Sequence, residues 1–435
     1  MLFRQYPRLR FPSLIATSVL IAVVLLSACW GSDRITATPT PVATVQPAIA
    51  ASPTATTPFS APGVVEHQPL TLWIPAGFAA GIEPTIDPDI AAAIREFSAQ
   101  SPDAPLEIIL KAEEGEASIL SYLRTGQQVA PSILPDILLV DARQLWQIVE
   151  LGLAQPLTTT QLTHRTDFYP FVWDAVTLDG QIYGIPYFTT PLTLVYNPAK
   201  IATPPATWAE LVELGRRFAF PAAGHNGYAD DWLLLQYRNA GGAWDSTSAV
   251  NPNVLLKLFQ AIEQARASGA LSPVTMNYTS PSGVWSALLA DDVQMGSLPA
   301  NLYLGQRSMA NQLLVASLPQ LNGSDQTLAS VYTFVILAKE ADRKAQALAL
   351  IDTLLDPTVH GTWAHLSSWL PTRLPALNAW PADDATLAQM RGLLEEAVAL
   401  PGDPSFSELS KRLQLLFNGV MNGELSAEEA AKAYQ

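Results

Sequence analysis

The stretch "DGQIYGIPYFTTPLTLVYNPAK", residues 179–200, decides the fold of this chain. It opens with Asp179-Gly180, a dipeptide typical of a tight hairpin turn. Apolar residues, tyrosines and prolines follow, and Pro186 fixes its own φ and removes a backbone donor. The stretch contains no obvious nucleophile, metal ligand or phosphate-binding loop. Its role therefore depends on the elements around it.

Those surrounding elements alternate between strand and helix. "LTLWIP" (70–75) is a short apolar strand, and Asp87 and Pro88 suit the start of a helix whose apolar residues recur on one face. A further strand, 137–140, leads into a helix that ends at Gly152. The alternation predicts an α/β fold with a parallel sheet. Further helices are expected at 252–268, 343–355 and 384–399, with capping boxes at Thr207/Glu210 and Ser426/Glu429.

Composition narrows the class of protein. A length of 435 residues exceeds what one core usually serves, so two lobes are expected. The formal net charge of −15 disfavours nucleic acid and anionic membrane surfaces as partners. One cysteine allows neither an intrachain disulfide nor a cysteine metal cage. His360 and His365 lack a nearby acidic pattern, so no metal site and no cofactor are expected.

The N-terminus is typical of an export signal, residues 1–28. Arg4, Arg8 and Arg10 precede an apolar run, 14–26, that is shorter than a membrane-spanning helix requires. "LSAC" (26–29) resembles the bacterial lipoprotein processing motif, which implies that Cys29 is lipidated and becomes the first mature residue. The alternative is an uncleaved membrane anchor with an incidental cysteine.

Residues 29–68 are rich in Pro, Thr and Ala and show no periodicity. Such a segment cannot bury a core and is predicted to be an extended tether. At about 3.1 Å per residue it could hold a domain up to roughly 100 Å from the lipid. A tether suits a receptor that reaches for a solute, and it equally suits the stalk of a surface enzyme.

An ordered set of motifs resembles the extracytoplasmic solute-binding proteins of bacterial ABC importers, in the family that includes maltose-binding protein. The motifs, which span Leu70 to Ala433, are "LTLWIP", "PDILLVDARQLWQIVELGLAQPL", "DGQIYGIPY" with "LVYNPAK" and "PPATWAEL", "GGAW", "LPTR" and "NGELSAEEA". One position departs from the family pattern. Where the family often has a Gly-Pro-Trp, this chain reads "QMGSLPANLY", and Asn301 takes the place of a ligand-stacking tryptophan.

The resemblance implies a two-lobe periplasmic-binding-protein fold with a cleft between lobes and several hinge crossings. One lobe is expected at 69–188 plus 321–370, and the other at 189–320 plus 371–435. It further implies a monomeric, lipid-anchored receptor on the outer face of the cell membrane, which delivers a neutral polar solute to permease subunits. A mono- or oligosaccharide is the expected solute.

Eight residues are expected to contact the ligand. Loops that follow strands should line the cleft, because ligands collect at the carboxyl ends of strands in open α/β sheets. Aromatic rings suit the apolar faces of sugars, and carboxylates accept from sugar hydroxyls. The expected residues are Phe78, Glu114, Asp141, Tyr187, Trp232, Asn301, Trp369 and Phe406.

Two other functions remain open from sequence alone. A tethered glycosidase needs two carboxylates that flank one bond, and the acidic pairs Asp230-Asp231 and Asp291-Asp292 are adjacent residues that do not face each other across a substrate. We therefore expect no enzyme activity and no catalytic residues. A lipoprotein that senses a ligand for a membrane sensor would have the same sequence features as an import receptor.

Overall fold

A computed structural model describes residues 68–81, 87–101, 105–244, 250–322, 324–381, 385–400 and 404–434. The predicted signal peptide, Cys29 and the tether up to residue 67 lie outside the described residues. Residues 65–435 form one structural unit. None of the described helices combines the length and apolar character needed to cross a membrane.

The strands are β1 (Leu70–Pro75), β2 (Leu106–Lys111), β3 (Ile137–Asp141), β4 (Thr177–Leu178), β5 (Gln181–Ile182), β6 (Ile185–Tyr196), β7 (Phe218–Ala219), β8 (Met295–Pro299), β9 (Leu314–Ala316), β10 (Thr327–Ile336), β11 (Leu370–Pro371) and β12 (Ala397–Ala399). The α-helices are α1 (Pro88–Gln100), α2 (Ile119–Val129), α3 (Leu145–Glu150), α4 (Phe171–Asp174), α5 (Trp208–Leu214), α6 (Asp231–Asn239), α7 (Pro252–Ser268), α8 (Pro281–Leu289), α9 (Ala300–Gln306), α10 (Ala341–Leu354), α11 (Pro357–Leu366), α12 (Ala385–Glu395), α13 (Pro404–Asn422) and α14 (Ala427–Ala433). Short 3-10 helices include η1 (Ala76–Gly81), η3 (Ala142–Gln144) and η6 (Pro273–Asn277).

Within the described residues, ten strands form one sheet with the central order β2-β1-β3-β10-β6-β8-β7. β1 is parallel to both β2 and β3, as the strand–helix alternation predicted. β10 is antiparallel to β3 and to β6, and β6 is antiparallel to β8. The sheet is therefore mixed, because β10 arrives from far along the chain and inserts between β3 and β6.

The local signals explain several element boundaries. Asp179 and Gly180 have φ values of 50° and 75°, which makes a tight turn between β4 and β5. Both predicted capping boxes are present, at Thr207/Glu210 and Ser426/Glu429. The helix expected to continue to Ala399 instead ends at Glu395, because 397–399 pair as β12 with the start of β10.

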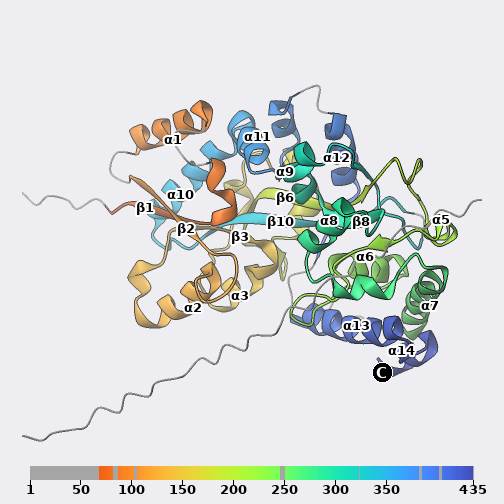
Figure 1. The fold of residues 1–435 in the computed structure, drawn as a ribbon. Helices are drawn as coiled ribbons and strands as arrows, with labels where there is room; N and C mark the ends of the chain where they lie inside the picture. The colour runs from red at the N-terminus through yellow and green to blue at the C-terminus, as the bar shows by residue number, and fades with distance from the viewer. Residues whose placement is uncertain are drawn as a thin grey trace, which may run out of the picture. The chain divides into compact units, whose positions relative to one another are not determined.

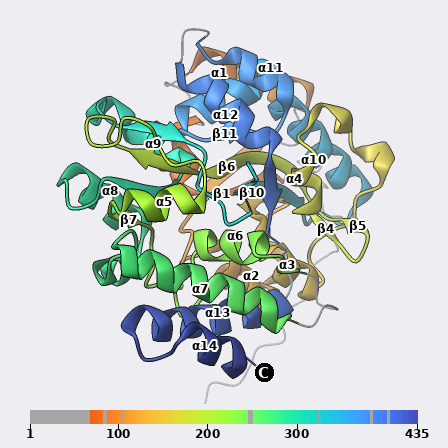
Figure 2. The same cartoon turned by 90° about the vertical axis from the view of Figure 1, so that its right-hand side faces the viewer.

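Two hydrophobic cores lie in the unit, and β6 contributes to both. Core 1 gathers around β1, β3 and β10, with α1 and α10 on one face of the strands and α2 and α3 on the other (Figure 1). Core 2 gathers around α6, α7, α13 and α14, and the last three lie side by side (Figures 1 and 2). Every residue of β6 is buried, with Phe188 in core 1 and Leu194 in core 2. The expected lobe boundaries stay a prediction.

Candidate functional site

A cavity of about 320 Å³ lies where elements of both cores meet. Its floor includes residues of the long strands β6 and β10, and its walls come from loops at the ends of β2 and β3, from the start of α6 and from β8 and α9. The cavity is lined by Glu113, Asp141, Arg143, Thr190, Leu192, Pro221, Asp230, Asp231, Pro281, Ser297, Pro299, Asn301, Ser330, Tyr332 and Trp369.

Arg143 joins two walls of this cavity. The Asp141 carboxylate, at the end of β3, accepts from the backbone N–H of Arg143 at 2.8 Å and from its guanidinium at 2.7 and 3.0 Å. The same guanidinium lies 3.5 Å from a carboxylate oxygen of Asp231, the first residue of α6. Asp141 and then Asp231 raise the pKa of Arg143, so the guanidinium is charged at all physiological pH values.

Asp230 caps the N-terminus of α6 and accepts a hydrogen bond from the Trp232 N–H at 2.9 Å. Burial, with a further contribution from the neighbouring Asp231, raises the pKa of Asp230 to about 8. Burial also raises the pKa of Asp231, against the lowering effect of Arg143. This shift favours the protonated form of the Asp230 carboxyl near neutral pH.

Glu113 and Tyr332 meet on another wall. Burial and then the Asp141 charge raise the pKa of Glu113, while a hydrogen bond from the Tyr332 hydroxyl lowers it. Burial raises the pKa of the Tyr332 phenol well above its usual value, so it remains a hydrogen-bond donor. This wall offers both donors and acceptors to a polar ligand.

The opposite wall carries neutral polar groups. The Asn301 N–H donates to Thr190 Oγ1 at 2.9 Å, and the Thr190 hydroxyl donates to Asn301 Oδ1 at 3.2 Å. This pairing fixes the amide of Asn301 at the start of α9. Ser297, in β8, is only 2% exposed, and its Oγ has no hydrogen-bond partner among the described residues. A buried hydroxyl without a partner is costly, and a ligand in the cavity would supply one.

Trp369 presents the aromatic surface of the cavity. Its ring centroid lies 5.2 Å from that of Phe78 and 5.0 Å from that of Tyr332. Phe78 is completely buried and stacks on Phe188 at 4.8 Å, so Trp369 rests on a rigid aromatic support. Three expected ligand residues, Asp141, Asn301 and Trp369, are thus brought together in one cavity.

The structure places Tyr187 in core 1 rather than in the cavity, which corrects the expectation that it faces the ligand. The side chain is 0% exposed, its hydroxyl donates to the Leu354 carbonyl at 2.9 Å, and its ring stacks on His360 at 4.3 Å. The reason is that both faces of β6 are covered, so Tyr187 points into the face packed under α11. Phe78 likewise supports the cavity from behind without lining it.

Three other expected residues also lie away from the cavity. Trp232 is 0% exposed and packs at 4.1 Å on Phe220 in core 2, because its side of α6 faces inward while the helix N-terminus faces the cavity. Phe406 is buried in core 2 and contacts Trp244. The Glu114 side chain is 73% exposed and pairs with His225 at 3.4 Å, while the preceding Glu113 lines the cavity.

Sequence reasoning missed the contributions of Arg143, Ser297 and Tyr332 and did not assign Asp230 and Asp231 to ligand contact. Arg143 follows the strand-ending Asp141 by two residues, a spacing at which its backbone N–H and side chain can both donate to that carboxylate. The sequence therefore contained a signal for this contact. Ser297 and Tyr332 sit inside strands and carry no comparable signal. The described residues hold no group of three or more His, Cys, Asp or Glu arranged to bind a metal ion.

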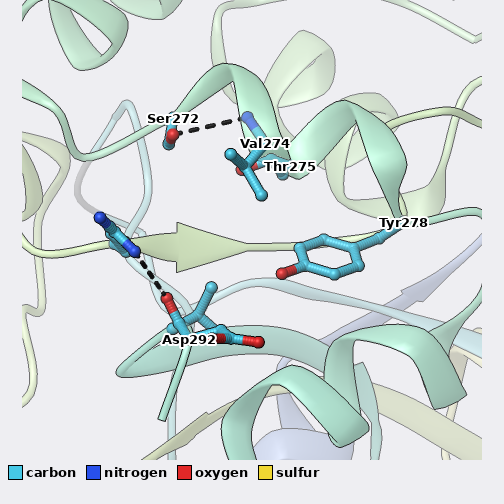
Figure 3. A pocket seen from close by; sticks show the side chains of 7 residues that line it. Ser272, Val274, Thr275, Tyr278 and Asp292 are labelled. Atoms are coloured by element: carbon cyan, nitrogen blue, oxygen red, sulfur yellow. Dashed lines mark hydrogen bonds between the residues drawn. The ribbon is translucent and has the colours of Figure 1, made fainter. Parts of the chain in front are cut away.

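A second cavity, of about 220 Å³, lies near η6 and the residues that precede β8 (Figure 3). The Ser272 hydroxyl accepts from the Val274 N–H at 3.4 Å, and Arg217 donates to the Asp292 carbonyl at 3.3 Å. Tyr278 faces this cavity (Figure 3), and burial raises its pKa. None of the residues expected to bind ligand lines it, so the first cavity is the better candidate site.

Comparison with known protein families shows which family this chain resembles. The family described as bacterial extracellular solute-binding protein matches residues 92–389, well over half of the chain. A lactose-binding protein of Rhizobium radiobacter is 24% identical over 263 residues, which cover 55% of this chain and 60% of that protein. The chain thus matches less than two thirds of this relative. The resemblance inferred from the ordered motifs is confirmed.

Solved structures with the same fold cover most of the chain. The cyclic α-maltosyl-1,6-maltose binding protein from Arthrobacter globiformis has a TM-score of 0.67 at 17% identity over 84% of this chain and 96% of its own. The GacH receptor of Streptomyces glaucescens has a TM-score of 0.65 at 18% identity over 84% and 97%. A protein from Thermotoga lettingae bound to α-D-tagatose has a TM-score of 0.63 at 20% identity over 84% and 97%. These likenesses confirm the expected two-lobe fold.

Proposed function

Because the chain belongs to the family of bacterial extracellular solute-binding proteins, we propose that it is the receptor of an ABC importer and captures a mono- or oligosaccharide. The sugar binds in the cavity lined by Trp369 and Asp141, and permease subunits in the membrane receive it. The family description supports a location outside the cytoplasm. Lipid attachment at Cys29 holds the receptor on the outer face of the membrane, although that residue lies outside the described residues.

One observation carries this proposal: a supported aromatic ring and several hydrogen-bonding side chains face the same cavity. Trp369 offers a flat apolar surface on which the C–H face of a sugar ring can stack. Asn301, Ser297 and Tyr332 surround it with amide and hydroxyl groups that match ring hydroxyls. This mixture of one apolar face and convergent polar groups is typical of a small-molecule site.

Ligand binding also closes the two lobes in this proposal. The cavity walls come from elements of both cores, so a ligand that contacts Asp141 beside core 1 and Asp231 at the start of α6, in core 2, favours the conformation that brings them together. The lobes are 69–188 plus 321–370, and 189–320 plus 371–435. Small-angle scattering should show a decrease in radius of gyration when a saturating ligand is added.

A thermal-shift screen tests the proposed function directly. The purified chain from residue 65 onward is heated with neutral sugars, amino sugars, amino acids and polyamines, and hits are measured by calorimetry. A sugar that raises the melting temperature and binds with micromolar affinity, about −8.2 kcal/mol, supports the function. Stabilisation by amino acids or polyamines alone, with every sugar inert, would refute the sugar assignment.

A further inference from the structure

The charges that line the cavity do not balance. Four carboxyl groups face it, those of Glu113, Asp141, Asp230 and Asp231, and Arg143 is the one cationic side chain among the described lining residues. The Arg143 guanidinium is already engaged by Asp141 and by Asp231. Neither Glu113 nor Asp230 forms an ion pair with a cationic side chain among the described residues, although the charge of Arg143 reaches Asp230.

Asp230 is the carboxyl whose ionised form has the least support from its surroundings. It is held at the N-terminus of α6, where it accepts from the Trp232 N–H. Two charges face it, the like charge of Asp231 on the same helix and the guanidinium of Arg143 from η3, while Asp141, Glu113 and Tyr332 line the same cavity. Burial and then the charge of Asp231 raise the pKa of Asp230, which favours the protonated carboxyl near neutral pH.

A separate observation concerns a neutral residue that lines the same cavity. Ser297 Oγ is buried and lacks a partner, and Ser297 lines the cavity together with Asp230. A hydroxyl in this position can donate to or accept from a ligand hydroxyl. Ser297 is neutral and belongs to β8, so it points to a ligand independently of the carboxyl groups.

We propose that the ligand is an amino sugar, whose protonated amine pairs with Asp230 while its ring stacks on Trp369 and a hydroxyl satisfies Ser297. This inference rests on the proposed function and specifies the substrate class of the same site. It replaces the neutral solute that the family resemblance implied, because a family resemblance does not fix the charge balance inside one cavity. The amine supplies a positive charge for Asp230, because the Arg143 guanidinium already pairs with Asp141 and Asp231.

Binding should release a proton. An ammonium group beside Asp230 favours the carboxylate, so the pKa of about 8 falls and the carboxyl ionises as the ligand enters. Because the raised pKa favours the protonated carboxyl near neutral pH, ionisation of Asp230 releases a proton when the ammonium group binds. A neutral sugar in the same position causes no such release.

The test uses sugars that differ at one substituent. Glucosamine, N-acetylglucosamine and glucose form one matched set. Galactosamine, N-acetylgalactosamine and galactose form a second. Each set is extended by the corresponding disaccharides with α-1,4 and β-1,4 linkages. Calorimetry at pH 7 in phosphate and in Tris, whose ionisation enthalpies differ, gives both the affinity and the number of protons released. We expect the amine form to bind about tenfold more tightly than its neutral counterparts, with proton release.

Two variants separate the role of Asp230 from a general charge effect. Asp230→Asn keeps the helix cap and resembles the protonated carboxyl, so the protein should fold while the amine preference and the proton release disappear. Glu114→Gln removes the same charge from the exposed neighbouring loop and should leave both unchanged. An amine preference that survives in Asp230→Asn would overturn the assignment of Asp230.

The remaining outcomes of the sugar titrations distinguish the amino-sugar inference from the proposed function. Equal affinity for amine, acetamide and hydroxyl forms overturns the amino-sugar inference and leaves the proposed function standing. Binding of putrescine or of Mg²⁺ as tightly as the best amino sugar overturns the inference by showing that the cavity takes cations without a sugar ring. Failure of every sugar, neutral or amine, refutes the proposed function and with it the inference.

Discussion

Replacing Trp369 with alanine should weaken sugar binding without unfolding the protein. The indole lines the cavity and is half-buried against Phe78 and Tyr332, so one part of it faces the ligand and another is structural. Stacking of a sugar on an aromatic face contributes about 1 kcal/mol beyond burial. Roughly 40 Å² of apolar surface covered by the ligand contributes about 1 kcal/mol more. The sum of about 2 kcal/mol corresponds to a roughly 30-fold increase in Kd.

The assay is a calorimetric or tryptophan-fluorescence titration with the tightest sugar from the screen, beside urea unfolding of the same samples. Trp232→Phe is the matched control, because Trp232 is buried in core 2 and its ring lies outside the cavity. It should lower the free energy of unfolding by about 1–2 kcal/mol and leave Kd unchanged. The reasoning is refuted if Trp369→Ala changes Kd less than threefold, or if Trp232→Phe weakens binding as much.

Three further predictions follow from other residues. Tyr187→Phe removes the hydrogen bond to the Leu354 carbonyl and should lower the free energy of unfolding by about 1 kcal/mol with no change in sugar affinity; a tenfold weaker affinity would return Tyr187 to the site. Burial lowers the pKa of His360 to about 3 from its usual 6.5, so its stabilising contribution is complete above pH 6.5 and should fall by about 2 kcal/mol between pH 7.5 and pH 5. Asp230 acts in the opposite direction, because its raised pKa adds stability as pH falls. Urea unfolding of the wild type and of His360→Gln at both pH values isolates the contribution of the histidine. If both proteins lose the same stability between the two pH values, His360 is not the group responsible. Lastly, intact mass of protein made in a host that processes lipoproteins should show a chain that begins at a lipid-modified Cys29, and an unmodified cysteine would contradict the anchor.

The fold could be predicted largely because its signals are local. The turn at Asp179-Gly180, the two capping boxes and the helix at 252–268 depend on residues only a few positions apart, and all are present in the structure. The antiparallel insertion of β10 between β3 and β6 depends instead on residues more than 130 positions apart. No local pattern encodes such a pairing, so the parallel sheet inferred from alternation describes only part of the structure.

The site could be predicted only where a residue follows directly on a recognisable strand or motif. Asp141 ends β3, Asn301 lies in the first turn of α9 after β8, and Trp369 precedes β11, and each lines the cavity. Tyr187 was misplaced because β6 is buried on both faces, so the alternation of side chains does not tell which face meets the ligand. Glu114 was misplaced by one residue, since the turn that places Glu113 at the cavity follows no strand period.

Under the proposed function, the arrangement of charge in the cavity provides a way to couple ligand capture to lobe closure. Arg143 extends from η3, next to core 1, to Asp231 at the start of α6, in core 2, so the empty cavity already has one ionic contact between its walls. That contact is partly exposed, and solvent screens it, so alone it contributes little to closure. A ligand amine beside Asp230 adds a second ionic contact on the same helix end, while the sugar ring rests on Trp369 and Tyr332 of the other wall. Because a ligand shifts a conformational equilibrium only through its different affinities for the two states, contacts that exist only when both walls are in place are the ones that drive closure. In this proposal the Asp230 carboxyl, which forms no ion pair among the described residues, is therefore the group through which ligand binding favours the closed state.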